Sequence, residues 1–112
     1  MSSQESYLKG IEHFSEDRYD EAIEELKRAL EMEPDYGDAL QALAMCYYSR
    51  KDFDQAIQQG LRFQEVEPSN PMAYTSLSIF YQAKGMIPEA EEMGAKAQAA
   101  AAQEKSPDVN LS

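Results

Sequence analysis

The side chains that most often carry enzyme chemistry are sparse in this chain of 112 residues. It holds a single histidine, His13, and a single cysteine, Cys46. A zinc site needs three or four ligands and a cysteine nucleophile needs a base beside it, so neither residue has the partners for that chemistry. The lone cysteine also excludes an internal disulfide. We predict that both side chains are structural and that the chain holds no metal and no cofactor.

Adjacent carboxylates, such as Glu24-Glu25, are the remaining candidates for acid–base catalysis. One carboxyl of such a pair must be buried so that its pKa rises into the working range. Arg28 lies four residues after Glu24, which instead indicates a solvated helix face. The chain has neither a glycine-rich phosphate loop nor a Ser–His–Asp set. We therefore predict no catalytic residues and no enzyme activity.

The charge of the chain disfavours two classes of partner. Twenty-one acidic and ten basic residues leave a net charge of −11. A chain this acidic repels phosphate backbones and anionic lipids, so we expect neither a nucleic-acid nor a membrane partner. The first residues lack the basic and apolar segments of a signal peptide, and no apolar run reaches about 18 residues, so we expect a cytoplasmic protein.

The acids are concentrated in the first third of the chain. Residues 1–36 hold eleven acidic and four basic residues. This excess either steers a basic partner or simply keeps an exposed helix soluble.

The elements that must position any site follow an internal repeat of 34 residues. Ala22, Ala56 and Ala90 keep this interval, as do Pro34 and Pro68. We call positions that differ by 34 a row. Two further rows are Tyr19, Phe53 and Ile87, and His13, Tyr47 and Tyr81. Three copies, at about 3–36, 37–70 and 71–104, therefore account for most of the chain.

Each copy reads as two helices. In the second copy Leu40, Leu43, Ala44 and Tyr47 fall on one face of a helix, and the segment after it begins at Asp52, a good N-cap residue. No strand pattern occurs, so we predict an all-α domain of six helices over residues 1–105. Ser106-Pro107 is expected to end the last helix and leave residues 106–112 as a disordered tail.

A 34-residue helix–turn–helix unit with small residues in fixed rows resembles the tetratricopeptide repeat (TPR) family. The residues that match the family pattern are Leu40, Leu43, Ala44, Tyr47, Ala56 and Pro68 in the second copy, Tyr74, Leu77, Ser78, Tyr81, Ala90 and Ala97 in the third, and Gly10, Ala22, Ala29 and Pro34 in the first. The first copy departs from the pattern at Ser6 and Lys9. The resemblance implies a right-handed superhelical solenoid with the first helix of each repeat on the concave side.

The third copy differs from the other two in one row. Glu91 stands where the earlier copies have Ile23 and Ile57. A terminal repeat needs a polar outer surface, so we expect the array to finish at three copies.

In the family, ligands contact the exposed face of each first helix. The resemblance carries this role to nine residues: Tyr7, Ile11, Phe14, Gln41, Met45, Tyr48, Thr75, Ile79 and Gln82. Within each helix they are spaced i, i+4 and i+7, so they share one face. Ile11, Met45 and Ile79 form an aliphatic row, which favours a groove that binds apolar side chains.

The best-known TPR subgroup clamps acidic C-termini with Lys, Arg and Asn side chains. The matching positions here are Tyr7, Ile11, Ala42, Met72 and Ser76. None of them carries the required charge or amide, so we predict no carboxylate clamp.

Two functions remain open at the level of the sequence. The first is a non-catalytic interaction module, a scaffold or chaperone adaptor that binds a partner peptide or helix through apolar anchors. The second is a structural module that forms a homodimer through the groove or its alanine-rich last helix.

Overall fold

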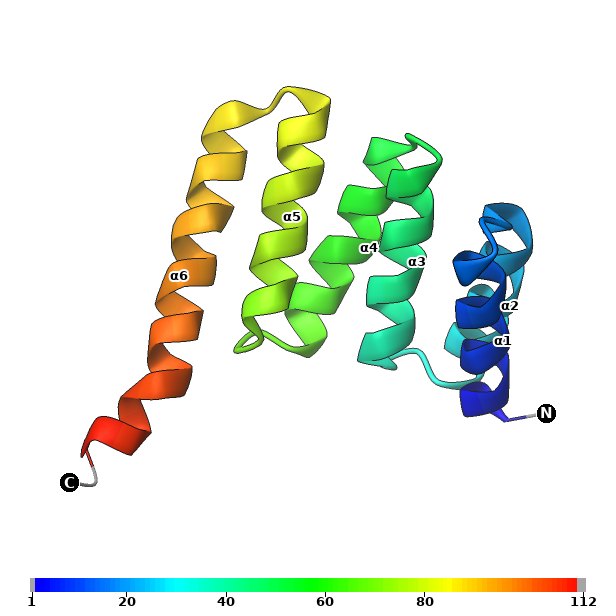
Figure 1. Ribbon diagram of the computed structural model, residues 1–112, viewed down its shortest axis with the longest axis horizontal. Helices are drawn as coiled ribbons and strands as arrows, with labels where there is room; N and C mark the ends of the chain where they lie inside the picture. Colours follow the sequence, from blue (N-terminus) through cyan, green and yellow to red (C-terminus); the bar gives the residue numbers. More distant parts are fainter. Residues whose placement is uncertain (1, 111–112) are drawn as a thin grey trace.

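The computed structural model describes residues 2–110, with side chains up to residue 104. Within this range all regular structure is helical, which confirms the predicted fold class. The six helices follow one another across the molecule, with the two ends of the chain at opposite ends of the array (Figure 1). They are α1 (Ser3–Ser15), α2 (Tyr19–Met32), α3 (Gly37–Ser49), α4 (Phe53–Val66), α5 (Pro71–Lys84) and α6 (Ile87–Asn110).

Local sequence explains where these helices begin and end. Ser2 and Glu5 form a capping box at α1, because the Ser2 side chain accepts from the Glu5 N–H while the Glu5 carboxylate accepts from the Ser2 N–H. Asp52 caps α4 by accepting from the Gln55 N–H. Asn70 caps α5 by accepting from the Met72 N–H at 2.9 Å. The first helices of the pairs start 34 residues apart, at residues 3, 37 and 71, although α3 follows Tyr36 without a side-chain cap.

The turn between α5 and α6 contains a residue in the left-handed region, as do the equivalent turns at Asp17 and Lys51. Gly85 has a φ of 87°, which lies in the left-handed region, and it ends α5. A residue with a Cβ would adopt this conformation only at a cost.

Each helix packs against its sequence neighbours, so the array has a continuous core rather than three separate ones. Ala22 and Ala56, in the small-residue row of the second helices, are fully buried, as are Leu26, Leu77 and Phe80. The molecule measures 46 × 35 × 22 Å along its principal axes. The elongated shape follows from stacking helix pairs that cannot bury their apolar faces alone.

The two helices of a pair approach closely at the small residues that the sequence singled out. A Cβ added at Gly10 would lie 2.7 Å from the Cγ of Leu26, so a larger side chain at this position would push α1 and α2 apart. In the third pair the Ser78 hydroxyl donates to the Ala90 carbonyl across the same interface, at 2.9 Å. Small residues in this row therefore let the two helices of a pair approach closely.

The sequence predicts that the last helix ends at Ser106-Pro107, and the structure describes α6 to Asn110. A disordered tail at residues 106–112 stays a prediction. Leu111 and Ser112 lie outside the described residues.

Two ion pairs that the sequence analysis did not foresee recur with the repeat. Arg50 in the turn after α3 pairs with Asp20 of α2 at 2.6 Å. Lys84, one repeat later, pairs with Asp54 of α4. Both pairs therefore join one repeat to the next at equivalent positions, on exposed surface where such pairs contribute little to stability.

Candidate partner-binding face

The nine candidate residues lie on the first helix of each pair, three on each of α1, α3 and α5. We call the surface that they form the inner face. Their i, i+4, i+7 spacing holds in the structure because all three helices are continuous over these positions. Their exposure differs strongly along the array, however, and this difference decides which of them are free to contact a partner.

The aromatic members of the inner face are packed against the core. The ring of Tyr7 lies 5.2 Å from that of Tyr36, measured between centroids. Phe14 contacts Tyr19 at 5.7 Å, in a tilted arrangement typical of aromatic pairs. All of these rings are partly buried.

Tyr48 has aromatic contacts on two sides. Its ring lies 5.8 Å from Phe53 and 5.4 Å from Phe80, which belongs to the following repeat. Tyr7, Phe14 and Tyr48 therefore supply a fixed aromatic surface rather than mobile side chains.

The aliphatic row becomes more exposed toward the third repeat. Ile11 is half-buried, and Met45 is half-buried against the main core cluster. Ile79 is 40% exposed, so it is the most accessible member of this row. The open end of this row is therefore at Ile79.

The polar members follow the same trend. Gln41 is half-buried, whereas Thr75 and Gln82 are exposed. The Thr75 hydroxyl donates to the Pro71 carbonyl at 3.1 Å, within its own helix. The third repeat consequently presents the most accessible part of the inner face.

One carboxylate lies beside this surface. Asp38 is exposed in the first turn of α3 and precedes Gln41 and Met45 by three and seven residues, which places it on the same helix face. Burial raises the pKa of the Tyr7 hydroxyl, and the negative charge of Asp38 raises it further. The pKa of Tyr36 is raised by the same two causes, with a smaller contribution from Glu33.

Cys46 has the environment of a core residue. It is fully buried, and burial raises the pKa of its thiol to about 11, so the reactive thiolate is scarce at neutral pH. His13 is half-buried near the end of α1. Among the residues with described side chains, no three His, Cys, Asp or Glu residues lie close enough together to hold a metal ion.

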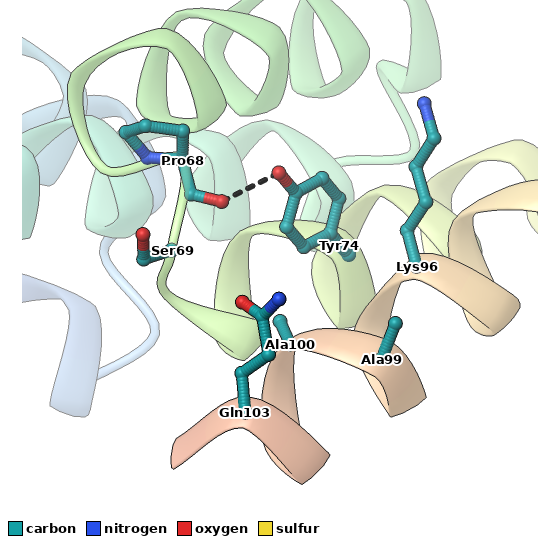
Figure 2. A pocket seen from close by; sticks show the side chains of 7 residues that line it. All are labelled: Pro68, Ser69, Tyr74, Lys96, Ala99, Ala100 and Gln103. Carbon is teal, nitrogen blue, oxygen red and sulfur yellow. Dashed lines mark hydrogen bonds between the residues drawn. The ribbon is translucent and has the colours of Figure 1, made fainter. Parts of the chain in front are cut away.

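A hollow that the sequence analysis missed lies away from the inner face. It has a volume of about 300 Å³ and lies between α6 and the turn before α5 (Figure 2). Its lining residues are Pro68, Ser69, Tyr74, Lys96, Ala99, Ala100 and Gln103. The Tyr74 hydroxyl donates to the Pro68 carbonyl at 2.6 Å, which fixes the ring at one wall of the hollow.

The repeat explains why this hollow exists. In the second repeat the equivalent space is filled, because Leu40 packs on Phe63 and Val66. In the third repeat Val66 is replaced by Ala100, which lines the hollow and leaves this space open. The exchange of valine for alanine in this row is the sequence feature that could have revealed the hollow.

None of the helices over residues 2–110 is both long and apolar enough to cross a membrane.

Known proteins share this helical architecture. A family model described as tetratricopeptide repeat matches residues 13–59. A solved structure of MamA is 28% identical, with a TM-score of 0.91 over 94% of this chain, and a second MamA structure is 30% identical, with a TM-score of 0.89 over 99%. The chain spans about 60% of the length of these two proteins. No curated protein sequence matches the chain.

A more distant neighbour contains a bound peptide. The second TPR of Spaghetti, solved with the HSP90 peptide SRMEEVD, has a TM-score of 0.84 at 17% identity and aligns over 89% of this chain and 93% of its own. At this identity the likeness concerns the fold alone.

Proposed function

The chain is a tetratricopeptide repeat protein with three repeats, and we propose that it is a non-catalytic interaction module that binds a partner peptide or helix across the inner face. The observation that carries this proposal is the exposed side chain of Ile79 at the end of the row that begins with Ile11 and Met45. Contiguous exposed apolar surface commonly marks an interaction site.

The packed aromatic rings support the same role. Tyr7, Phe14 and Tyr48 are held by ring contacts, so a partner would not have to order them on binding. Avoiding this entropic cost improves affinity for a given contact area. We propose that a partner places apolar side chains against Ile11, Met45 and Ile79.

Polar inner-face residues would fix the register of such a partner. Gln41, Thr75 and Gln82 flank the aliphatic row and offer amide and hydroxyl groups to a peptide backbone. We expect a dissociation constant in the micromolar range, as for other transient interactions. This corresponds to a binding free energy on the order of −8 kcal/mol. We also propose that acidic C-termini are not clamped here, because Tyr7, Ile11, Ala42, Met72 and Ser76 supply no cation.

The test uses peptides selected from a random 12-residue display library against the whole chain. The strongest peptide is labelled with a fluorophore, and its binding is measured by anisotropy. We expect Ile79→Lys and Met45→Glu each to weaken binding by about tenfold or more, because a buried charge would replace an apolar contact.

The matched control is Leu61→Glu, which changes an apolar residue of similar exposure on α4, a second helix of a repeat. It should leave the affinity unchanged, and circular dichroism should show intact helices in every variant. If the wild type, Ile79→Lys and Met45→Glu bound the peptide with equal affinity, the inner face would not be the binding site.

Self-association is the alternative function. Ile87 in the first turn of α6 is 46% exposed, close in sequence to the open end of the inner face, and the alanines of α6 allow close helix contact. The net charge of −11 opposes it, because two copies repel each other. Sedimentation equilibrium separates the two hypotheses. A monomer at all concentrations would contradict the homodimer, whereas a tight dimer that buries Ile79 would contradict the interaction module. A cytoplasmic location stays a proposal that cell fractionation would test.

A further inference from the structure

We propose that the partner of the inner face is a cationic amphipathic segment rather than an acidic one. A lysine or arginine of this segment would lie beside Asp38 and over the Tyr7–Tyr36 ring pair, while its apolar residues contact the aliphatic row. This inference rests on the proposed function and specifies the chemistry of the partner.

The first argument is the absence of positive charge from the inner face. The lysine and arginine residues within α1, α3 and α5 are Lys9 and Lys84. Each lies two residues from an inner-face position, Lys9 from Ile11 and Lys84 from Gln82, and so points about 160° away around the helix. Lys84 is in addition paired with Asp54. An acidic segment on this face would therefore meet no cation.

The second argument is that the carboxylate beside this face has no partner of its own. Asp38 is exposed, and the ion pairs among the described side chains involve other acids. Asp38 follows Tyr36 by two residues, and the ring of Tyr36 contacts that of Tyr7. The negative charge of Asp38 accordingly raises the pKa of both hydroxyl groups. A cation placed there would gain a charge partner without displacing an existing one.

The third argument is the pair of rings next to this carboxylate. Tyr7 comes from α1 and Tyr36 directly precedes α3, and their centroids are 5.2 Å apart with the planes tilted by 38°. Both rings are partly exposed. An ammonium or guanidinium group over such a ring is attracted by its electron-rich face, and a nearby carboxylate adds to this attraction.

Helix electrostatics offers a competing explanation for Asp38. An acid in the first turn of α3 interacts favourably with the positive end of the helix dipole. That role would affect the stability of the protein and not the choice of partner. An experiment must therefore measure both quantities on the same variants.

The probe is the random 12-residue display library introduced above, selected against the whole chain and sequenced. We expect the bound peptides to be enriched in lysine and arginine next to apolar residues and depleted of aspartate and glutamate. Peptides that need Ile79 and Met45 but are neutral or acidic would overturn this inference and leave the proposed function standing. Peptides indifferent to both residues would overturn the proposed function itself.

The selected peptide then tests the position of the charge. We expect Asp38→Asn to weaken its binding by about three- to fivefold at low salt, and less at high salt, because the contact is solvent-exposed. Glu24→Gln is the control: it removes one charge from an exposed position on α2 and should have a smaller effect. Equal losses in the two variants would show attraction by net charge only and contradict the proposed site.

The aromatic contact has its own test. We expect Tyr7→Leu, which keeps an apolar side chain, to weaken binding of the selected peptide by about two- to fivefold. Melting temperatures of Asp38→Asn and Tyr7→Leu report separately on stability. Unchanged binding with a lowered melting temperature would assign both residues to the fold alone and overturn the inference.

Discussion

Residues of the same row are buried in one of the two terminal repeats and exposed in the other. In the first repeat, residues that face the second repeat are buried, such as Ile23, whereas Glu12 on the other side is exposed. In the third repeat, Phe80 contacts Tyr48 of the second repeat and is fully buried, whereas Glu91, in the row of Ile23, is exposed. Whether a row is core or surface thus depends on the neighbouring helix more than on its place in its own helix.

The inner face shows the same difference. Tyr48 is partly covered by Phe80 of the following repeat, whereas Gln82, in the same row, is exposed. Ile11 and Met45 are half-buried, whereas Ile79 is exposed. The inner face therefore presents packed aromatic rings over the first two repeats and an exposed aliphatic side chain on the third.

We expect the largest change in the free energy of unfolding from substitutions in the row that contains Glu12 and Phe80. Phe80→Ala should lower the free energy of unfolding by about 3–5 kcal/mol, because it empties a packed site and removes the contact with Tyr48. Glu12→Ala, in the same row, should change it by less than about 0.5 kcal/mol. Urea unfolding measures both, and similar losses in the two variants would contradict the comparison.

An intermediate effect is expected in the row of Gly60 and Gly94. A Cβ at Gly60 would lie 2.9 Å from Leu77 of the next repeat, whereas at Gly94 its nearest neighbour would be the Ser78 hydroxyl oxygen at 3.7 Å. We expect Gly60→Ala to destabilise by about 1 kcal/mol through overpacking. Gly94→Ala should stabilise by about 0.5–1 kcal/mol, because alanine favours the helix.

Thermal and urea unfolding of these two variants would reveal the sign of each change. If Gly60→Ala stabilised the protein as much as Gly94→Ala does, the close approach of α4 and α5 would be wrong.

The smallest effect is expected for the ion pair between Asp20 and Arg50, which joins the first repeat to the second. A double-mutant cycle with Asp20→Asn and Arg50→Gln should give a coupling energy of about 0.2–1 kcal/mol, because both side chains are at least half exposed. The coupling should shrink in 1 M salt. A larger coupling that salt leaves intact would mean that this junction is more buried than described.

The parts of the fold that the sequence predicted are those set by repetition. The 34-residue interval and the small side chains of Gly10 and Ala22 determine where helices lie and how closely they pair, and both were readable from residue types. The cap at Asp52 was predicted for the same reason, since it depends on a local hydrogen bond.

The features that were missed depend on contacts between distant residues. The hollow beside Tyr74 arises because Ala100 of α6 replaces Val66 of α4, and its shape cannot be read from either helix alone. The uneven exposure of Ile11 and Ile79 was not predicted, since both are isoleucines in one row and only their neighbours differ.

The most direct test of the account is amide chemical-shift mapping of the whole chain with the peptide selected from the random library. The account predicts that the largest shifts fall on inner-face positions of α1, α3 and α5, with Met45, Ile79 and Gln82 among them. Shifts confined to α2, α4 and the outer side of α6, with the inner face unchanged, would contradict it.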